Sequence, residues 1–196
     1  MKVPNEVYAA VLNAFVAPLD AKVSRPWFNQ QTGTAYASNR RELVRVGGLN
    51  SAPCECAPWD SAPSDLDRFF EGFKAIDDLG FQSVYRAAEI ALARFGVKNA
   101  QLVEDELLED GERAYVRVDG MYFAAGVVRN LCMACAMVYD GVDEPRIFTD
   151  GRLLCMACGT VQAIAMPVYG FSDACGLHGG DVVCDVRSLF VMEGER

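Results

Sequence analysis

Two identical cysteine boxes hold the residues whose types and spacing could do chemistry. Cys132-Met-Ala-Cys135 and Cys155-Met-Ala-Cys158 are separated by nineteen residues. Four thiolates spaced in this way bind one structural Zn²⁺ in a zinc ribbon, because each two-residue gap lets a tight turn aim both sulfurs at the ion. On this interpretation the protein holds one structural Zn²⁺ and binds nucleic acid or protein.

The residues around the boxes favour a second interpretation, in which the cysteines are packing residues and no cofactor is bound. Met and Ala fill both boxes, and the flanking residues are Leu131, Leu153, Leu154 and Val161. Reduced cysteine is a small apolar side chain that is often buried. In a strand, residues i and i+3 point to opposite faces, so a strand through either box could not aim both sulfurs at one ion. Both interpretations remain open at the level of sequence.

The other candidate ligands and nucleophiles form no recognisable catalytic motif. A second metal site or a Cys–His pair would have to come from Cys54, Cys56, Cys175, His178 and Cys184. His178 is the only histidine, and no Asn or Asp in an identifiable motif accompanies it. The sequence contains no P-loop, no dinucleotide-binding glycine pattern and no H-E-x-x-H. We therefore expect a protein without enzymatic activity.

Composition sets the class of protein. With 196 residues and 52% hydrophobic content, the chain can bury the core of one large domain or of two small ones. Lys and Arg number 18 against 27 Asp and Glu, so the net charge of -9 predicts no broad cationic face.

Pro4, Asn5 and Glu6 interrupt the place of a signal peptide, and no window is apolar enough to span a membrane. A soluble cytoplasmic protein with reduced thiols is expected.

The elements that position these residues follow from periodicity. Apolar residues recur at helical spacing over 3–17. Residues 22–46 predict two short strands and a turn, and residues 50–64, with three prolines, predict an irregular loop. Helical periodicity returns over 64–95, where Gly80 divides two predicted helices.

The second half is predicted to be rich in strands. Period-2 alternation marks the strand at 113–119, and Asp150-Gly151 suits a type I′ hairpin turn. In chain order, the pattern predicts a strand at 113–119, a helix at 121–131 and strands at 136–139, 146–149, 152–155, 160–168 and 188–192.

Several short motifs together with this order of elements resemble a known family. Val23-Ser24-Arg25-Pro26 and Ala37-Ser38-Asn39-Arg40-Arg41-Glu42-Leu43 follow the first helix, and Ala165-Met166-Pro167-Val168 closes the last strand. The chain resembles the DNA sliding clamp of bacteria and phages, the polymerase beta-subunit type, especially its short phage forms. Ser38-Asn39-Arg40 departs from the Thr-Asp-Gly of that family. Residues 50–64 and the chain after 168 have no counterpart in it.

The resemblance implies an α+β fold of two related clamp-like halves, each a helix packed on an antiparallel sheet. The halves would be residues 1–100, with 50–64 as an inserted loop, and residues 101–168, with a C-terminal extension at 169–196. At most two clamp domains fit in this length, so a six-domain ring would need three copies.

The resemblance also implies two surfaces and a role. Partner peptides with apolar side chains would bind a pocket that includes Met166, Pro167 and Val168. Double-stranded DNA would face basic residues that contact phosphates. These are Arg25, Lys74, Arg86, Arg94, Lys98 and Arg129. The implied role is that of an oligomeric processivity factor, a tether or platform for replication proteins.

Overall fold

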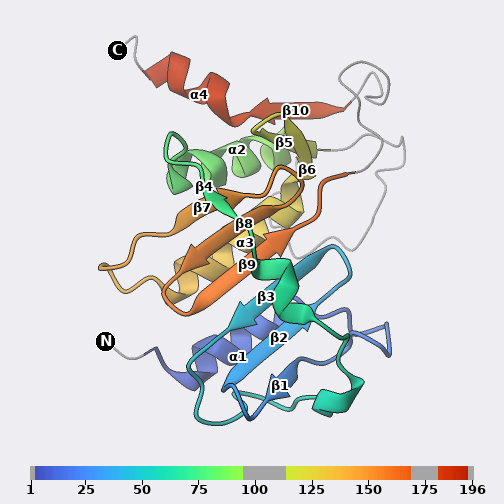
Figure 1. The fold of residues 1–196 in the computed structure, drawn as a ribbon. Coiled ribbons are helices and arrows are strands. Elements are labelled where there is room, and N and C mark those ends of the chain that lie inside the picture. Colours follow the sequence, from blue (N-terminus) through green and yellow to red (C-terminus); the bar gives the residue numbers. More distant parts are fainter. Residues whose placement is uncertain (1–2, 95–113, 169–180, 194–196) are drawn as a thin grey trace.

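Two β-sheets and four α-helices make up the part of the chain that the computed structural model describes, residues 3–94, 114–168 and 181–193. The larger sheet has seven antiparallel strands in the order β1-β2-β3-β9-β8-β7-β4. The smaller has the order β10-β5-β6, and its β10 and β5 are parallel. The mixed α+β class predicted from the sequence is confirmed (Figure 1).

The strands of the larger sheet are β1 (Trp27–Asn29), β2 (Thr34–Ser38), β3 (Glu42–Val46), β4 (Lys74–Ala75), β7 (Arg146–Thr149), β8 (Leu154–Cys158) and β9 (Val161–Ala165). Those of the smaller are β5 (Ala114–Val118), β6 (Met121–Ala124) and β10 (Val182–Asp185). The helices are α1 (Asn5–Asn13), α2 (Phe81–Ala93), α3 (Ala125–Val138) and α4 (Val186–Glu193), with short 3₁₀ turns η1 (Trp59–Ser61) and η2 (Leu66–Phe70). None of the described helices is long and apolar enough to cross a membrane.

The centre of the larger sheet is the seam between β3 and β9. Five residue pairs run from Glu42 opposite Ala165 to Val46 opposite Val161. On one face of the seam, α1 and α3 bury their apolar sides in a single core that includes Leu12 and Leu131. Figure 1 shows both helices behind the same sheet. The seam therefore joins two segments that are more than a hundred residues apart in the sequence.

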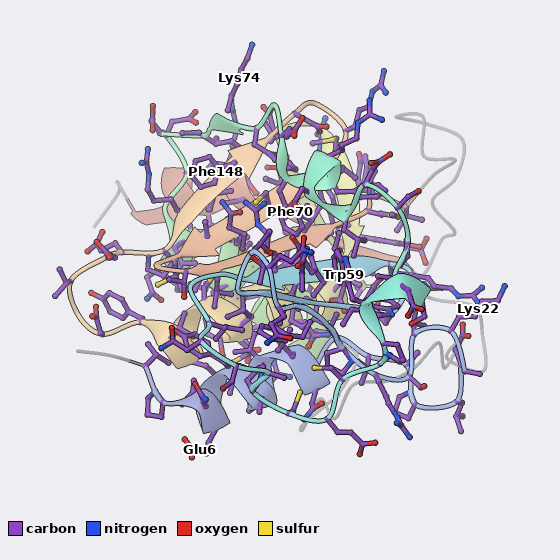
Figure 2. The ribbon with its side chains drawn as sticks, turned by 60° about the horizontal axis from the view of Figure 1, so that its bottom comes forward. Glu6, Lys22, Trp59, Phe70, Lys74 and Phe148 are labelled. Carbon is purple, nitrogen blue, oxygen red and sulfur yellow. The ribbon has the colours of Figure 1, made fainter. Side chains whose placement is uncertain are left out.

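Residues 57–70 cover part of the other face of the sheet. Leu66 is buried there in a small second core with Trp27 and Tyr36. The phenolic hydroxyl of Tyr36 donates to the carboxylate of Asp67 at 2.6 Å. The guanidinium of Arg45 also binds Asp67, at 2.9 Å. Figure 2 shows this segment crossing the sheet, with Trp59 and Phe70 labelled on it. The side chains of Leu66 and Asp67, which follow the loop predicted at 50–64, thus fix this segment to the sheet, and Ala57 and Ala62 of the loop pack against the same small core.

The N-terminal predictions are confirmed for the helices at 3–17 and after Gly80, which the structure bounds as α1 and α2. Residues 22–46 form three strands instead of two. The helix predicted before Gly80 is wrong. Gly72 has a φ of 78° and turns the chain into β4, which pairs with β7, so only the short η2 remains helical.

In the second half, the strands at 113–119 and 160–168 are confirmed with shorter bounds, as β5 and β9. The helix predicted at 121–131 is shifted. Residues 121–124 form β6, because Asp119 and Gly120 both have positive φ and make the turn that returns the chain along β5.

The helix α3 starts at Ala125 and continues through Val138, so the strand predicted at 136–139 is wrong. The strand predicted at 188–192 is also wrong, because those residues belong to α4. The hairpin around Asp150-Gly151 is confirmed, but its turn is not type I′. Only Gly151 has a positive φ, and the Asp150 carboxylate accepts the N–H groups of Arg152 and Leu153 in a longer turn.

Candidate functional site

The predicted peptide-pocket residues lie where the two sheets meet. Met166 follows β9 directly, and its N–H donates to the carbonyl of Arg41 at 3.0 Å. Two residues later, the N–H of Val168 donates to the carbonyl of Tyr122 in β6 at 2.9 Å. The segment therefore connects the β3 side of the larger sheet to the smaller sheet. Met166 is 38% exposed, so its side chain is available to a partner, whereas Pro167 and Val168 are half-buried.

Glu42 is a buried carboxyl group next to this segment. It starts β3 opposite Ala165 and is 2% exposed, the one charged side chain buried among the described residues. The amide nitrogens of Asn39 and Asn130 donate to it, at 2.5 Å and at 3.1 Å. Burial raises the pKa of Glu42 to about 7, although both amides and Arg41 lower it. Its carboxyl group joins the turn before β3 to α3.

Glu42 was not singled out from the sequence, although a signal was present. In the run Glu42-Leu-Val-Arg-Val46, residues 42, 44 and 46 share one face of a strand. Val44 and Val46 are plainly core residues. A lone acidic residue in register with them indicates a buried carboxyl group that needs hydrogen-bond partners.

The predicted DNA-facing residues that the structure describes lie on several elements. Arg25 precedes β1 and is ion-paired with Glu55 at 2.7 Å. Lys74 lies in the edge strand β4, and Figure 2 places it on the opposite side of the molecule from Glu6 of α1. Arg94 is exposed at the end of α2, and Lys98 lies outside the described residues.

Two of the predicted basic residues lie on neighbouring helices. Arg86 is on α2, and Arg129 is on α3, where its guanidinium binds Glu89 of α2 at 2.6 Å. The helix α1 carries no basic residue, and Glu6 is its one charged side chain. The helix layer thus presents mixed charge. The ion pair with Glu89 offsets part of the positive charge of Arg129, which would otherwise attract a DNA phosphate.

The four box cysteines are buried on two elements. Cys132 and Cys135 lie in α3, and Cys155 and Cys158 lie in β8. Burial raises the pKa of all four thiols, well above the ordinary range for Cys135 and to about 12 for Cys155. The Sγ of Cys132 lies 3.5 Å from the sulfur of Met156. All four cysteines thus pack as small apolar side chains.

The second box places its two sulfurs on opposite faces of the sheet. Through β9, Cys158 is aligned with Val46, which belongs to the core under α1 and α3. Cys155 is aligned in the same way with Leu43, which packs on the other face. No three His, Cys, Asp or Glu side chains of residues 3–94, 114–168 and 181–189 are placed to hold one metal ion. No observation therefore favours the zinc-ribbon alternative. Cys175 and His178 lie outside the described residues, and Cys184 is buried in β10.

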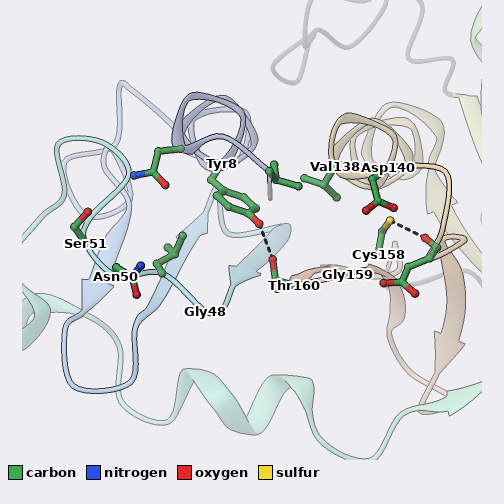
Figure 3. A pocket seen from close by; sticks show the side chains of 13 residues that line it. Tyr8, Gly48, Asn50, Ser51, Val138, Asp140, Cys158, Gly159 and Thr160 are labelled. Atoms are coloured by element: carbon green, nitrogen blue, oxygen red, sulfur yellow. Dashed lines mark hydrogen bonds between the residues drawn. The ribbon is translucent and has the colours of Figure 1, made fainter. Parts of the chain in front are cut away.

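A recess of about 500 Å³ opens at the other end of the seam (Figure 3). It lies between the start of α1, the residues after β3 and the turn between β8 and β9. The hydroxyl groups of Tyr8 and Thr160 are hydrogen-bonded at 3.1 Å, and the thiol of Cys158 donates to the carbonyl of Asp143 at 3.2 Å. Burial raises the pKa of Cys158, and Asp140 and Asp143 raise it further. The arrangement pairs no nucleophile with a base, so it does not suit covalent catalysis.

Comparison with solved structures finds similarity in fold, whereas comparison of sequences does not. No family model matches the chain, and no curated protein matches it. A crystal structure described as "Putative DNA polymerase III beta subunit" from Eubacterium rectale ATCC 33656 superimposes with a TM-score of 0.55 at 7% sequence identity. The superposition covers 87% of this chain and 64% of that one, so this chain spans less than two thirds of its relative. The fold is clamp-like.

Proposed function

We propose that the protein is a clamp-like accessory protein of DNA replication, a non-enzymatic oligomeric tether or platform for replication proteins, DNA or both. The observation that carries the proposal is the superposition, over 87% of the chain, on the Eubacterium rectale structure described above. Folds host many functions, so the surfaces have to support the role independently.

The order of elements supports the part of the proposal that concerns two related halves. A helix followed by three antiparallel strands occurs twice, as α1-β1-β2-β3 and as α3-β7-β8-β9. The third strands of both units form the seam. The proposed division of the chain is into residues 1–100, 101–168 and 169–196.

The surfaces favour a protein platform over a DNA-encircling ring. The net charge is -9, α1 has no basic residue, and Arg25 and Arg129 are already ion-paired. Met166, in contrast, is an exposed apolar side chain on a backbone fixed from both sides. A partially exposed apolar anchor on a rigid backbone is the kind of residue that contributes strongly to binding a short peptide.

Met166→Asp tests this platform. We expect it to weaken the binding of short fluorescent peptides with Leu and Phe side chains by about tenfold or more, because a charge replaces an apolar contact. Fluorescence anisotropy measures the affinity. Because Met166 is 38% exposed, folding should be retained, and circular dichroism checks this.

Met137→Asp is the matched control. Met137 is 40% exposed on α3 and receives the same change of charge. It should leave peptide affinity unchanged. Equal affinities of the wild type and Met166→Asp would overturn the proposed pocket, and equal losses in both variants would show an effect of charge alone.

A further inference from the structure

Cys54 and Cys56 differ in exposure from the other cysteines that the structure describes. The buried ones are Cys132, Cys135, Cys155, Cys158 and Cys184. The side chains of Cys54 and Cys56 are half-buried in the segment 50–73, so a small reagent in solution can reach them. Neither thiol has a role in the proposed function.

Local contacts hold the two thiols together. The thiol of Cys56 donates to the carbonyl oxygen of Cys54 at 3.4 Å, so its side chain is folded back over the residue two positions earlier. Glu55, between them, is directed into solvent, where it binds Arg25 at 2.7 Å. The two thiols are also within hydrogen-bonding reach of each other, and the charged side chain between them does not separate them.

The backbone next to the pair is fixed to the sheet. The N–H of Ala57 donates to the carbonyl of Pro26 at 2.8 Å, and Ala57 forms a bridge with Trp27 at the start of β1. Holding two reacting groups in place raises their effective concentration, because the entropy of bringing them together has been lost on folding. The folded chain should thus favour a bond between these two sulfurs.

We propose that Cys54 and Cys56 are a redox-active pair that forms a reversible intramolecular disulfide with oxidised glutathione, or a similar small disulfide, as the oxidant. The thiolate of one cysteine attacks the oxidised glutathione, forms a mixed disulfide and releases one glutathione thiolate. The thiolate of the other then attacks the protein sulfur of that mixed disulfide and releases the second. Two protein thiols lose their protons and two electrons, and one oxidised glutathione becomes two reduced molecules.

Reversibility follows from the short spacing. One residue separates the cysteines, so the closed ring departs from relaxed disulfide geometry, and strained disulfides are readily reduced. The rate of disulfide exchange depends on the pKa values of the two thiols, which burial raises. Partial burial raises the pKa of Cys54, and burial together with the charge on Cys54 raises that of Cys56 to about 12. Exchange requires a thiolate, so it should accelerate as the pH rises.

Mass spectrometry of the full-length protein tests the pair. Native protein is incubated in glutathione buffers of increasing oxidised fraction, the exchange is quenched with acid, and free thiols are alkylated before digestion with trypsin. Arg45 and Arg68 bound a tryptic peptide, residues 46–68, whose only cysteines are Cys54 and Cys56. We expect this peptide to lose two hydrogens and both alkylation sites, and to recover both on reduction. Cys54→Ser and Cys56→Ser should each give a mixed disulfide with glutathione instead.

The first cysteine box provides the matched control. Residues 130–146, between Arg129 and Arg146, contain only Cys132 and Cys135, which are buried in α3. They should stay alkylatable in the same samples. The proposal is overturned if the 46–68 peptide carries only mixed disulfides, or if the disulfide forms no more readily in native protein than in urea.

Discussion

Glu42 shows how a single residue can make the stability of this fold depend on pH. Its carboxyl group is 2% exposed at the β3–β9 seam, and burial raises its pKa from the ordinary 4.5 to about 7. The folded protein therefore holds this proton more tightly than the unfolded chain does. The corresponding stabilisation is complete below about pH 4.5 and is lost as the pH rises through about 7.

Glu42→Gln should remove this dependence on pH. Between about pH 5 and pH 8, the wild type should lose up to roughly 3 kcal/mol of unfolding free energy from this group, because each pKa unit corresponds to about 1.4 kcal/mol. Urea denaturation across that range measures the slope for both proteins. Glu89→Gln is the control, since Glu89 lies in a partly exposed ion pair, and it should keep the slope. If Glu42→Gln kept the pH dependence of the wild type, that dependence would have to come from another group.

At the scale of elements, the turns fix how the strands pair. Gly33 lies in the turn between β1 and β2, with a φ of 63°, and its carbonyl accepts the N–H of Leu49 at 2.8 Å. A Cβ added there would lie 2.5 Å from the carbonyl oxygen of Leu49. Gly151, in the β7–β8 turn, also has a positive φ, 83°, but a Cβ there would meet nothing within 4 Å.

Gly33→Ala should therefore destabilise the protein more than Gly151→Ala. Both variants carry the cost of a positive φ, about 1 kcal/mol, but only the first adds a clash with backbone atoms. Thermal denaturation of the two variants measures the difference. Equal losses of stability would mean that Leu49 moves aside, and that the approach of residues 47–49 to this turn is not fixed.

At the scale of the whole molecule, a ring around DNA would require several copies of this chain. If each chain holds the two proposed clamp-like halves, three copies would supply six of them, whereas a protein platform could act in other oligomeric states. Light scattering at high concentration should detect an oligomer, and a strict monomer would make the ring untenable. If DNA is encircled, circular DNA should be retained through a salt wash that releases linear DNA, because phosphate contacts weaken with salt and topological linkage does not. Absence of DNA binding at low salt would leave only the protein platform.

The local elements of this fold follow from the sequence, because their signals are local. Helical spacing of apolar residues locates α1 and α2, and alternation locates β5. Where the sequence pattern suited either a helix or a strand, the neighbouring strand in the sheet decided which one formed. Residues 121–124 became a strand because a turn at Asp119-Gly120 returns them along β5, and residues 74–75 became one because β7 is beside them.

The candidate sites depended on tertiary structure to a greater degree. The sequence established two cysteine boxes with apolar neighbours, but only the fold placed one box in α3 and the other along β8, with Cys155 and Cys158 facing opposite ways. It also brought Glu42 to Ala165 and Asn130, and Arg41 to Met166. These contacts join residues far apart in the chain, and no local periodicity specifies which distant strand will complete a sheet. Residue types and spacing thus determined what chemistry was available, and long-range pairing decided which side chains were close enough to share it.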